Sequence, residues 1–318
     1  MDLRPYLDED LGAGDVTSAA LVPDTDGYGV ITCEEDAVAA GIEEACGVFA
    51  LMGVRAEPLA RDGDRVARGS AVIGLSGPLR GMLACERTAL NFLMRMSGIA
   101  TMASDMNAII KAAGGTAVVA GTRKTTPGFR RFEKKAIALG GGWPHRDGLY
   151  DMAMAKDNHI AACGGVAAAL SALGGIPKGI KVEIEVSTVR DGIMAAKRGV
   201  DVIMADHMGP RETRTLRDLA RAIDGRVRIE ASGNITPENI AEYAACADII
   251  SMGALTHSPR AVHYSMDVTD GPVAPGREAA PVEAAPGGAA PPQEARRAPS
   301  VHGRDWRETA PGGAETGL

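Results

Sequence analysis

Residues 117–130 read AVVAGTRKTTPGFR, and this stretch indicates how the chain folds. Its first four residues, Ala117–Ala120, are apolar, and the run ends abruptly in a segment that carries Arg123 and Lys124. Short apolar runs bounded by turn residues are typical of buried parallel strands. Charged residues directly after such a strand are typical of an active site built from the loops at one end of a parallel sheet.

Five further apolar runs end in the same way, in polar or glycine-rich residues. They are Met152–Ala155, Lys181–Ile184, Val202–Ala205, Val227–Ala231 and Asp248–Met252. Helical stretches separate the runs, so a strand–helix unit repeats along this part of the chain. The pattern predicts an enzyme built on an α/β barrel, an open or incomplete (β/α) barrel of about six to seven strands.

The composition divides the chain into four segments. We expect an N-terminal α+β sandwich domain, a barrel catalytic domain, a return segment that packs on the first domain, and a disordered tail rich in Pro, Ala and Gly. The expected bounds are 1–101, 102–257, 258–270 and 271–318. Within the first two segments, a long helix is expected from about Leu83, with Ser97-Gly98 weakening or ending it.

Charge and cysteine usage exclude several classes of protein. The net charge of −7 gives no reason to expect nucleic acid or an anionic membrane as a partner. No apolar run approaches the roughly 20 residues that a membrane-spanning helix needs, and no secretory signal is visible. The five cysteines include no CxxC pair, which fits a reducing compartment, and we expect a cytoplasmic protein.

Cations gather where the predicted strands end. Arg123, Lys124, His145, Arg146 and Lys156 would meet at one mouth of the barrel, which favours a substrate with several negative charges over scattered surface charge.

A helix follows the first of these cations. Thr126 and Pro127 predict its N-cap and first residue, and the glycines after Leu139 predict its end. Its remaining cations, Arg131, Lys134 and Lys135, are interpreted as a solvated face.

Acidic residues end the next two strands. Glu183 and Glu185 share one face of a strand and can both point inward, and Asp206 ends the strand that follows. These carboxylates can neutralise the cations as buried ion pairs. They can equally hold a divalent metal or ribose hydroxyls, or stabilise a developing positive charge, and both uses are compatible.

Two tripeptides after the last strands are candidates for binding a phosphate. Ser232-Gly233-Asn234 and Gly253-Ala254-Leu255 occupy the place where barrels of this kind commonly hold a phosphate monoester. The histidines near strand ends offer an alternative, a transition-metal site made from His145, His159, His207 and His257. We disfavour it, because no HxH or His–Cys spacing supports it. His159 and His207 are instead expected to fix the neighbouring Lys156 and Asp206.

Taken together, these motifs resemble the quinolinate phosphoribosyltransferase family, also called nicotinate-nucleotide pyrophosphorylase (carboxylating). The resemblance covers nearly all of the chain before the tail. It rests on segments 10–17, 86–91, 97–101, 122–127, 140–146, 156–159, 183–186, 206–207, 230–233 and 253–258, which occur in this order.

The resemblance implies a reaction and a set of roles. Quinolinate and phosphoribosyl pyrophosphate would give nicotinate mononucleotide, pyrophosphate and carbon dioxide, in the biosynthesis of NAD. The implied catalytic residues are Lys124, Lys156, Glu185 and Asp206. Substrates would be bound by these four and by Arg87, Arg123, His145, Arg146, Ser232, Gly233, Asn234, Gly253 and His257.

The resemblance also implies a cofactor and an assembly. Glu185 and Asp206 would serve Mg²⁺, largely through the substrate, and stabilise an oxocarbenium-like transition state. Arg87 would reach the site of a neighbouring subunit, which implies a homodimer or a higher homo-oligomer.

Three alternatives remain open. A molybdenum-transport-associated homologue would act on another acidic acceptor, and the presence of Arg87, Arg123, His145 and Arg146 argues against it. Nicotinate phosphoribosyltransferase would require ATP and release no carbon dioxide. A catalytically inactive barrel kept for binding has no physical reason to retain Lys124 and the other charged groups at one mouth.

Overall fold

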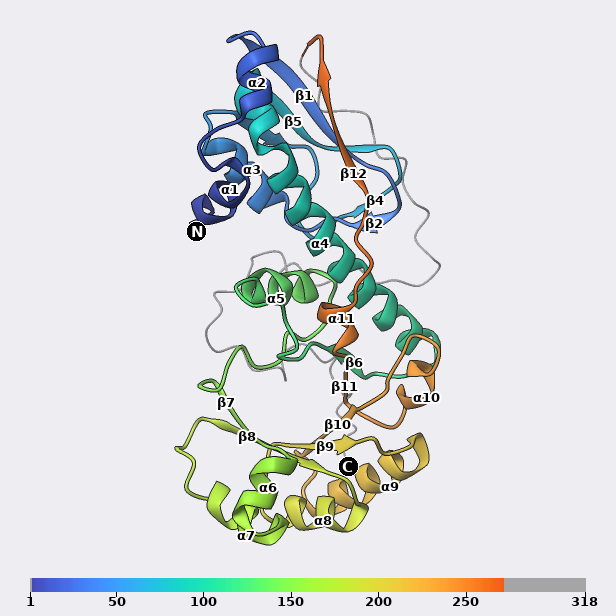
Figure 1. The fold of residues 1–318 in the computed structure, drawn as a ribbon. Helices are drawn as coiled ribbons and strands as arrows, with labels where there is room; N and C mark the ends of the chain where they lie inside the picture. Colours follow the sequence, from blue (N-terminus) through green and yellow to red (C-terminus); the bar gives the residue numbers. More distant parts are fainter. Residues whose placement is uncertain (1, 272–318) are drawn as a thin grey trace. The chain divides into compact units, whose positions relative to one another are not determined.

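The apolar runs form one parallel sheet in the computed structural model, which describes residues 2–271. Its strands are β6 (Val118–Ala120), β7 (Met152–Ala155), β8 (Lys181–Val186), β9 (Val202–Asp206), β10 (Arg228–Ser232) and β11 (Ile249–Ser251). They lie in the order β6-β11-β10-β9-β8-β7 (Figure 1), so the last strand of the series pairs with the first. A parallel bridge between Ala120 and Trp143 adds one residue of a seventh strand beside β6. The predicted open barrel of six to seven strands is confirmed.

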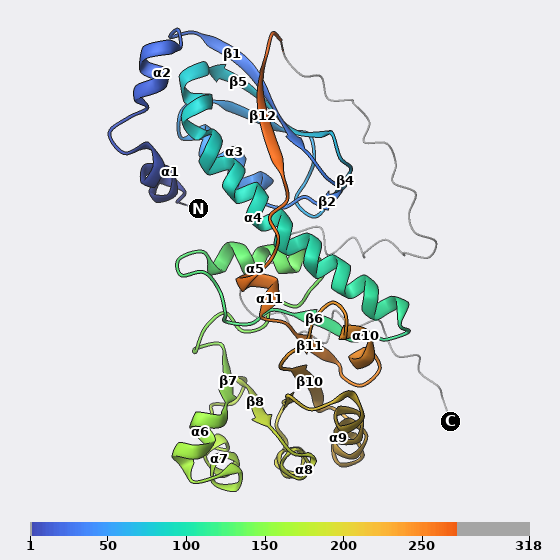
Figure 2. The ribbon, with the colours of Figure 1, turned by 45° about the vertical axis from the view of Figure 1, so that its right-hand side comes forward.

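Helices connect these strands, and some of them cover the sheet. The helices are α5 (Arg130–Leu139), α6 (Asp157–Cys163), α7 (Val166–Leu173), α8 (Val189–Lys197), α9 (Pro210–Ile223), α10 (Ile240–Tyr243) and α11 (Ala254–His257). Helices α6 to α9 lie along one side of strands β7 to β10 (Figure 2). There Ile184 and Ile203 of the sheet pack with Leu216 of α9 in a buried apolar cluster. Burial of this face leaves the strand ends to carry the polar residues.

The first part of the chain forms an antiparallel layer. Its helices are α1 (Arg4–Leu11), α2 (Val16–Leu21) and α3 (Ile42–Ala50), and its strands are β1 (Asp26–Cys33), β2 (Ala37–Val38), β3 (Arg55–Pro58), β4 (Arg65–Val66) and β5 (Ser70–Pro78). The main sheet has the order β12-β1-β5-β3, in which β12 (Tyr264–Thr269) returns from the end of the barrel to pair with β1. Most of the expected tail, from residue 272 on, lies outside the described residues.

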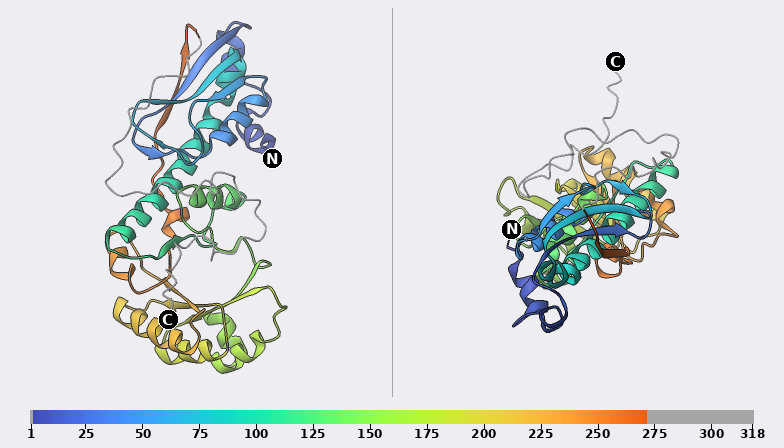
Figure 3. Two further views of the ribbon diagram at one scale, coloured as in Figure 1. Left: turned by 180° about the vertical axis from the view of Figure 1, so that it is seen from behind. Right: turned by 90° about the horizontal axis from the view of Figure 1, so that it is seen from above.

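A single long helix, α4 (Leu79–Ala112), serves both layers and includes residue 101, where we placed the domain boundary. It contacts α3 and β12 in one layer and α5, β6 and α10 in the other, and its full length is visible from behind (Figure 3). The expectation that Ser97-Gly98 would weaken or end the helix was wrong. The Ser97 hydroxyl donates a hydrogen bond to the Ala40 carbonyl oxygen at 3.1 Å. Gly98 allows the Arg260 carbonyl to approach, since a Cβ atom there would lie 2.2 Å from that oxygen.

Helix α5 begins later than the sequence predicts. Thr126 and Pro127 belong to a turn, in which the Phe129 N–H donates to the Thr126 carbonyl, and the helix starts at Arg130. The reason is aromatic packing: Phe129 contacts Phe92 and Phe132, with ring centroids 5.3 and 4.7 Å apart. These contacts bury the aromatic ring and fix the turn before the helix begins. The predicted end at Leu139 is confirmed.

Lys135 is also placed differently from the prediction. Its ammonium lies between Glu43, Glu44 and Asp62 of the first layer, at 2.8, 2.8 and 3.0 Å. Glu44 is buried, so this face of α5 is an interface between the two layers rather than a solvated surface. Arg131 alone among the three cations remains exposed as expected.

Among the described residues, no helix combines the length and the apolar character that crossing a membrane requires.

Candidate active site

The predicted site residues, with one exception, lie at the carboxyl ends of the parallel strands. Arg123 and Lys124 follow β6, Lys156 follows β7, Glu185 and Asp206 lie near the ends of β8 and β9, Ser232, Gly233 and Asn234 end and follow β10, and Gly253 and His257 belong to the turn and helix after β11. His145 and Arg146 follow the Trp143 bridge, which is the place of a seventh strand end. Parallel strands present their carboxyl ends at one edge, so the topology gathers these groups at one mouth.

His145 lies in the centre of a buried acidic cluster. Its Nε2 atom is 3.1 Å from Glu230 Oε2, with which it shares a hydrogen bond, and 3.3 Å from Glu183 Oε2. Its Nδ1 atom accepts the backbone N–H of Arg146 at 2.7 Å. The residue has a left-handed backbone conformation, with φ of 62°. That conformation is unfavourable for a side chain of this size, and it aims the ring inward.

The charges in this cluster favour a proton on the Nε2 side of the ring. Burial by itself would lower the pKa of His145, but the charges of Glu230 and Glu183 outweigh it and raise this pKa to about 9. Burial, with the charge of Glu230, raises the pKa of Glu183. Among the described residues, neither Glu183 oxygen accepts a hydrogen bond. Two buried carboxylates without a hydrogen-bond donor beside them would be costly, so a proton on Nε2 of His145 stabilises them.

Lys134 fixes the segment that carries His145 and Arg146. Its ammonium donates to the Arg146 carbonyl at 2.9 Å and to the Pro144 carbonyl. The residue is 4% exposed, so its assignment to a solvated face was wrong. Burial lowers the pKa of Lys134 to about 8. The Arg146 guanidinium also holds this segment, because it donates to the Met152 carbonyl at 3.2 Å.

Two carboxylates of the mouth are paired with neighbouring cations or imidazoles. Glu185 accepts a hydrogen bond from Lys156 at 2.7 Å. Asp206 lies 2.8 Å from Nδ1 of His207. His159 accepts the backbone N–H of Lys156 at 3.1 Å. The expectation that His159 and His207 fix the neighbouring Lys156 and Asp206 is therefore consistent with their contacts.

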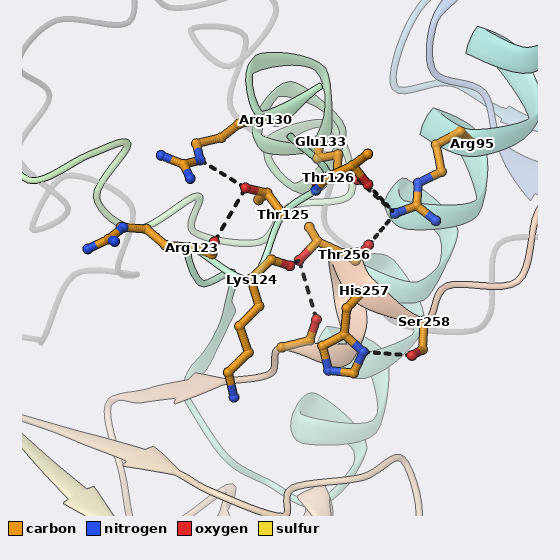
Figure 4. Close-up of polar contacts among 11 residues, drawn as sticks. Arg95, Arg123, Lys124, Thr125, Thr126, Arg130, Glu133, Thr256, His257 and Ser258 are labelled. Atoms are coloured by element: carbon orange, nitrogen blue, oxygen red, sulfur yellow. Dashed lines mark hydrogen bonds and ion pairs between the residues drawn. The ribbon is translucent and has the colours of Figure 1, made fainter. Parts of the chain in front are cut away.

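The two glycine turns are packed against other parts of the mouth. A Cβ atom at Gly233, whose φ is 89°, would lie 2.7 Å from the His207 ring. A Cβ atom at Gly253 would lie 2.9 Å from Lys124 Cδ and 3.1 Å from the His257 ring. The positive φ and the close ring therefore require glycine at position 233. At position 253 the Lys124 stem and the His257 ring pack closely against the turn, and both side chains are drawn in Figure 4.

Arg87, Asn234 and Arg123 are three of the exposed residues among the predicted set. Arg87 is exposed on α4, and its recorded ion pair, with Glu86 at 4.0 Å, links it to no other predicted site residue. Asn234 is exposed and has a φ of 54°. Arg123 is exposed as well, yet its charge helps to lower the pKa of Arg146, after the larger effect of burial, so the two arginines are electrostatic neighbours.

Comparison with known proteins identifies the family. Residues 15–97 match the N-terminal domain, and residues 99–267 the C-terminal domain, of quinolinate phosphoribosyl transferase. The chain belongs to the quinolinate phosphoribosyl transferase family. The resemblance inferred from the sequence motifs is thus confirmed.

Individual relatives agree with this family. The chain is 42% identical over 258 residues to a probable nicotinate-nucleotide pyrophosphorylase (carboxylating) of Archaeoglobus fulgidus, covering 80% of this chain and 98% of that one. A probable enzyme of the same name from Bacillus subtilis is 36% identical over 271 residues, which cover 84% of this chain and 92% of the relative.

Solved structures of this family have the same fold. NadC of Streptococcus pyogenes matches with a TM-score of 0.77 and 37% identity, over 85% of this chain and 95% of that one. The nicotinate-nucleotide pyrophosphorylase of Francisella tularensis matches with a TM-score of 0.78 and 32% identity, over 84% and 94%. Human nicotinic acid phosphoribosyltransferase, at 14% identity and a TM-score of 0.56, shares the fold alone.

The sequence patterns left out several residues that organise the mouth of the barrel. Glu230 was noted in a motif without a role, although it alternates with Ser232 and therefore shares its face of β10. Glu133 is fully buried and paired with Arg95. A single acid inside the basic run RRFEKK was the available signal, since a lone carboxylate among cations is placed where it can pair with one.

Proposed function

We propose that this chain transfers the phosphoribosyl group to quinolinate with loss of carbon dioxide, yielding nicotinate mononucleotide and pyrophosphate. The observation that carries this proposal is the position of Arg123, Lys124 and Arg146, with Glu185 and Asp206, at the carboxyl ends of the parallel strands. Quinolinate brings two carboxylates and its co-substrate brings a phosphate and a pyrophosphate, which match the cations. The ribose, where positive charge develops, matches the carboxylates.

Arg123 and Arg146 are the proposed ligands of the quinolinate carboxylates. Arginine forks bind carboxylates bidentately, and burial of Arg146 strengthens such a contact. His145 supports them, because its ring accepts the Arg146 N–H; direct contact with substrate requires its Nε2 atom to leave Glu230. The Lys124 stem lies against the turn at Gly253, and its ammonium is proposed to serve both quinolinate and the pyrophosphate.

The second substrate is placed on the other side of the mouth. Ser232, Gly233 and Asn234, with Gly253 and His257, are proposed to hold the 5′-phosphate through the closely packed glycine turns. Lys156 is proposed to bind the pyrophosphate as a point charge, and Glu185 orients it through their ion pair.

Glu185 and Asp206 fit Mg²⁺ as proposed ligands. They lie on adjacent parallel strands, and each is only partly buried. Hard carboxylate oxygens from one or two residues, completed by substrate phosphates, are the usual protein contribution to a magnesium site. When bound, the ion would neutralise charge on the leaving pyrophosphate.

The chain's own groups then account for the chemistry. Arg123 and Arg146 orient quinolinate so that its ring nitrogen faces the anomeric carbon, which forms the new C–N bond as the C–O bond to pyrophosphate breaks. The charges of Glu185 and Asp206 stabilise the oxocarbenium-like transition state. The quaternised nitrogen then stabilises the carbanion left when the adjacent carboxylate departs as carbon dioxide, and a proton takes its place.

The assembly and the compartment are part of the proposal. Arg87 points to a homodimer or higher homo-oligomer in which it completes a neighbour's site, because it is exposed on α4 and joins no other predicted site residue within its own chain. The five free cysteines and the charge of −7 support a cytoplasmic enzyme without nucleic-acid or membrane partners.

A direct assay tests the reaction. Purified protein is supplied with phosphoribosyl pyrophosphate, Mg²⁺ and either quinolinate or nicotinate, and nicotinate mononucleotide and carbon dioxide are followed together. We expect product from quinolinate alone, with one carbon dioxide for each nucleotide and no requirement for ATP. Product from nicotinate, or dependence on ATP, would instead support the nicotinate phosphoribosyltransferase alternative.

A further inference from the structure

Two loops that the proposed function assigns to different substrates are in direct contact. The loop after β6 carries Arg123 and Lys124, and the turn after β11 carries Gly253 and His257. The Thr256 hydroxyl donates to the Lys124 carbonyl at 2.8 Å, which joins one loop to the other. Thr256 is fully buried, so this hydrogen bond is shielded from competing water.

A buried carboxylate holds the first of these loops. Glu133 of α5 accepts the backbone N–H of Thr126 at 3.0 Å and the Thr126 hydroxyl at 2.9 Å. Its side chain is fully buried, and Figure 4 draws it beside Thr126. A carboxylate in this position needs a counter-charge, because its desolvation costs several kcal/mol.

Arg95 of α4 supplies that charge and reaches the second loop. Its guanidinium donates to Glu133 Oε1 at 2.7 Å and also to the Thr256 carbonyl. The side chain is 30% exposed, so its ion pair is shielded mainly on the Glu133 side. The same guanidinium therefore contacts both the group that fixes the first loop and the backbone of the second.

We propose that Arg95, Glu133 and Thr256 are positioning residues that couple the acceptor loop to the phosphoribosyl loop. Ordering one loop around its substrate then orders the other, so each substrate strengthens the binding of its partner. The proposal rests on the assignment of the loops made under the proposed function. Coupling of this kind between two sites typically changes an affinity by about 5- to 150-fold.

Single substitutions can each remove one of the contacts that join the two loops. Thr256→Val removes the hydroxyl that reaches Lys124 with little change in volume, and Thr256→Ser restores a hydroxyl. Glu133→Gln removes the charge that pairs with Arg95 and keeps the shape.

Glu44→Gln is the matched control. Glu44 of α3 is a buried carboxylate, 1% exposed, that also pairs with a cation of another helix, Lys135 of α5. Its recorded partners lie outside both loops, so this change costs stability without touching the link between them.

The measurement uses phthalate, a dicarboxylate that lacks the attacking ring nitrogen and so forms no product. Its Kd is measured by calorimetry with and without saturating phosphoribosyl pyrophosphate and Mg²⁺. In the parent and in Glu44→Gln we expect phthalate to bind at least about fivefold more tightly in the presence of the co-substrate. In Thr256→Val and Glu133→Gln the ratio falls toward one, and in Thr256→Ser it recovers.

The outcomes separate this proposal from the one on which it rests. Full coupling in Thr256→Val, or a ratio of one in the parent, would overturn the link between the loops while leaving the reaction intact. Failure of the parent to bind either ligand would overturn the loop assignment, and the coupling with it. If Glu133→Gln does not fold, Thr256→Val with its serine rescue still decides the matter.

Discussion

Lys134 shows how a single residue can set the geometry of the mouth without contacting a substrate. Its ammonium donates to the carbonyls on either side of His145, those of Pro144 and Arg146. Together with the acidic pair around the imidazole, this holds His145 in its left-handed conformation. Conformational strain at a functional position persists only when the surroundings over-determine it, and here a buried cation contributes to that constraint.

The stability of the protein should depend on pH through Lys134. Its pKa is about 8 when folded against an ordinary value of 10.5, so above pH 8 the unfolded chain binds more protons. The burial penalty is present in full below pH 8 and fades as pH rises toward 10.5. We expect the unfolding free energy of the parent to gain about 2 kcal/mol relative to Lys134→Met between pH 7 and 10. Urea unfolding of both proteins at each pH measures this; a constant difference would contradict it.

Removal of the Arg146 guanidinium should weaken quinolinate binding selectively. In Arg146→Ala we expect the KM for quinolinate to rise about a hundredfold, about 2.7 kcal/mol, with a much smaller effect on phosphoribosyl pyrophosphate. Arg131→Ala is the control, because this arginine is exposed on α5 and is not one of the predicted site residues. Equal losses for both substrates would count against a carboxylate-binding role.

At the scale of elements, α4 joins the two layers because its apolar surface is not confined to one face. Buried residues occur along most of its length, from Gly81 to Ile110, and the helix contacts elements of both layers. A glycine within such a helix normally signals weakness. At Gly98 the approach of the chain at Arg260 outweighs this cost.

Filling the space at Gly98 should destabilise the protein although it improves helix propensity. Gly98→Ala would place a methyl group 2.2 Å from the Arg260 carbonyl oxygen. The gain in propensity is about 1 kcal/mol, and we expect the clash to exceed it, with a net loss of about 1–3 kcal/mol. Asn91→Ala, on the exposed face of α4, is the control and should be neutral or slightly stabilising. Urea denaturation compares the free energies of unfolding of the two variants and the parent. A Gly98→Ala variant as stable as the parent would refute the close contact.

At the scale of the whole molecule, Arg87 is the predicted site residue whose role its own chain does not explain, because it is exposed on α4. Arg87 is one of the predicted substrate-binding residues, yet the described contacts connect it only with Glu86. A neighbouring copy of the chain would supply the missing partner, as the proposed dimer requires.

Mixing two inactive variants should restore activity if Arg87 acts in the neighbour's site. Arg87→Ala and Lys156→Ala are each expected to be nearly inactive alone. In mixed dimers both changes fall in one site and leave the other intact, so an equal mixture should regain about a quarter of the parent activity. The measurement is turnover of the mixture after subunit exchange. Activity no higher than that of the separate variants would place Arg87 in its own chain's site.

The positions of the parallel strands along the chain, and the residues that follow them, could be predicted from the sequence alone. Short apolar runs and the turn residues after them are local patterns, so the position of Lys156 or Asp206 at a strand end could be predicted from the neighbouring residues. The reaction family followed from the order of the motifs.

The groups that support the site come together through long-range packing. Glu133 meets Arg95 across 38 positions of sequence, and Arg95 meets Thr256 across 161. His145 meets Glu230 across 85. A local pattern can indicate that a charge is paired, as at Glu133, but it does not identify the partner, because a buried charge takes its partner from whichever element the packing brings close. Lys134 illustrates the same point. The sequence predicts a solvated position for it, but in the structure it lies in the interior, where two backbone carbonyls accept its hydrogen bonds.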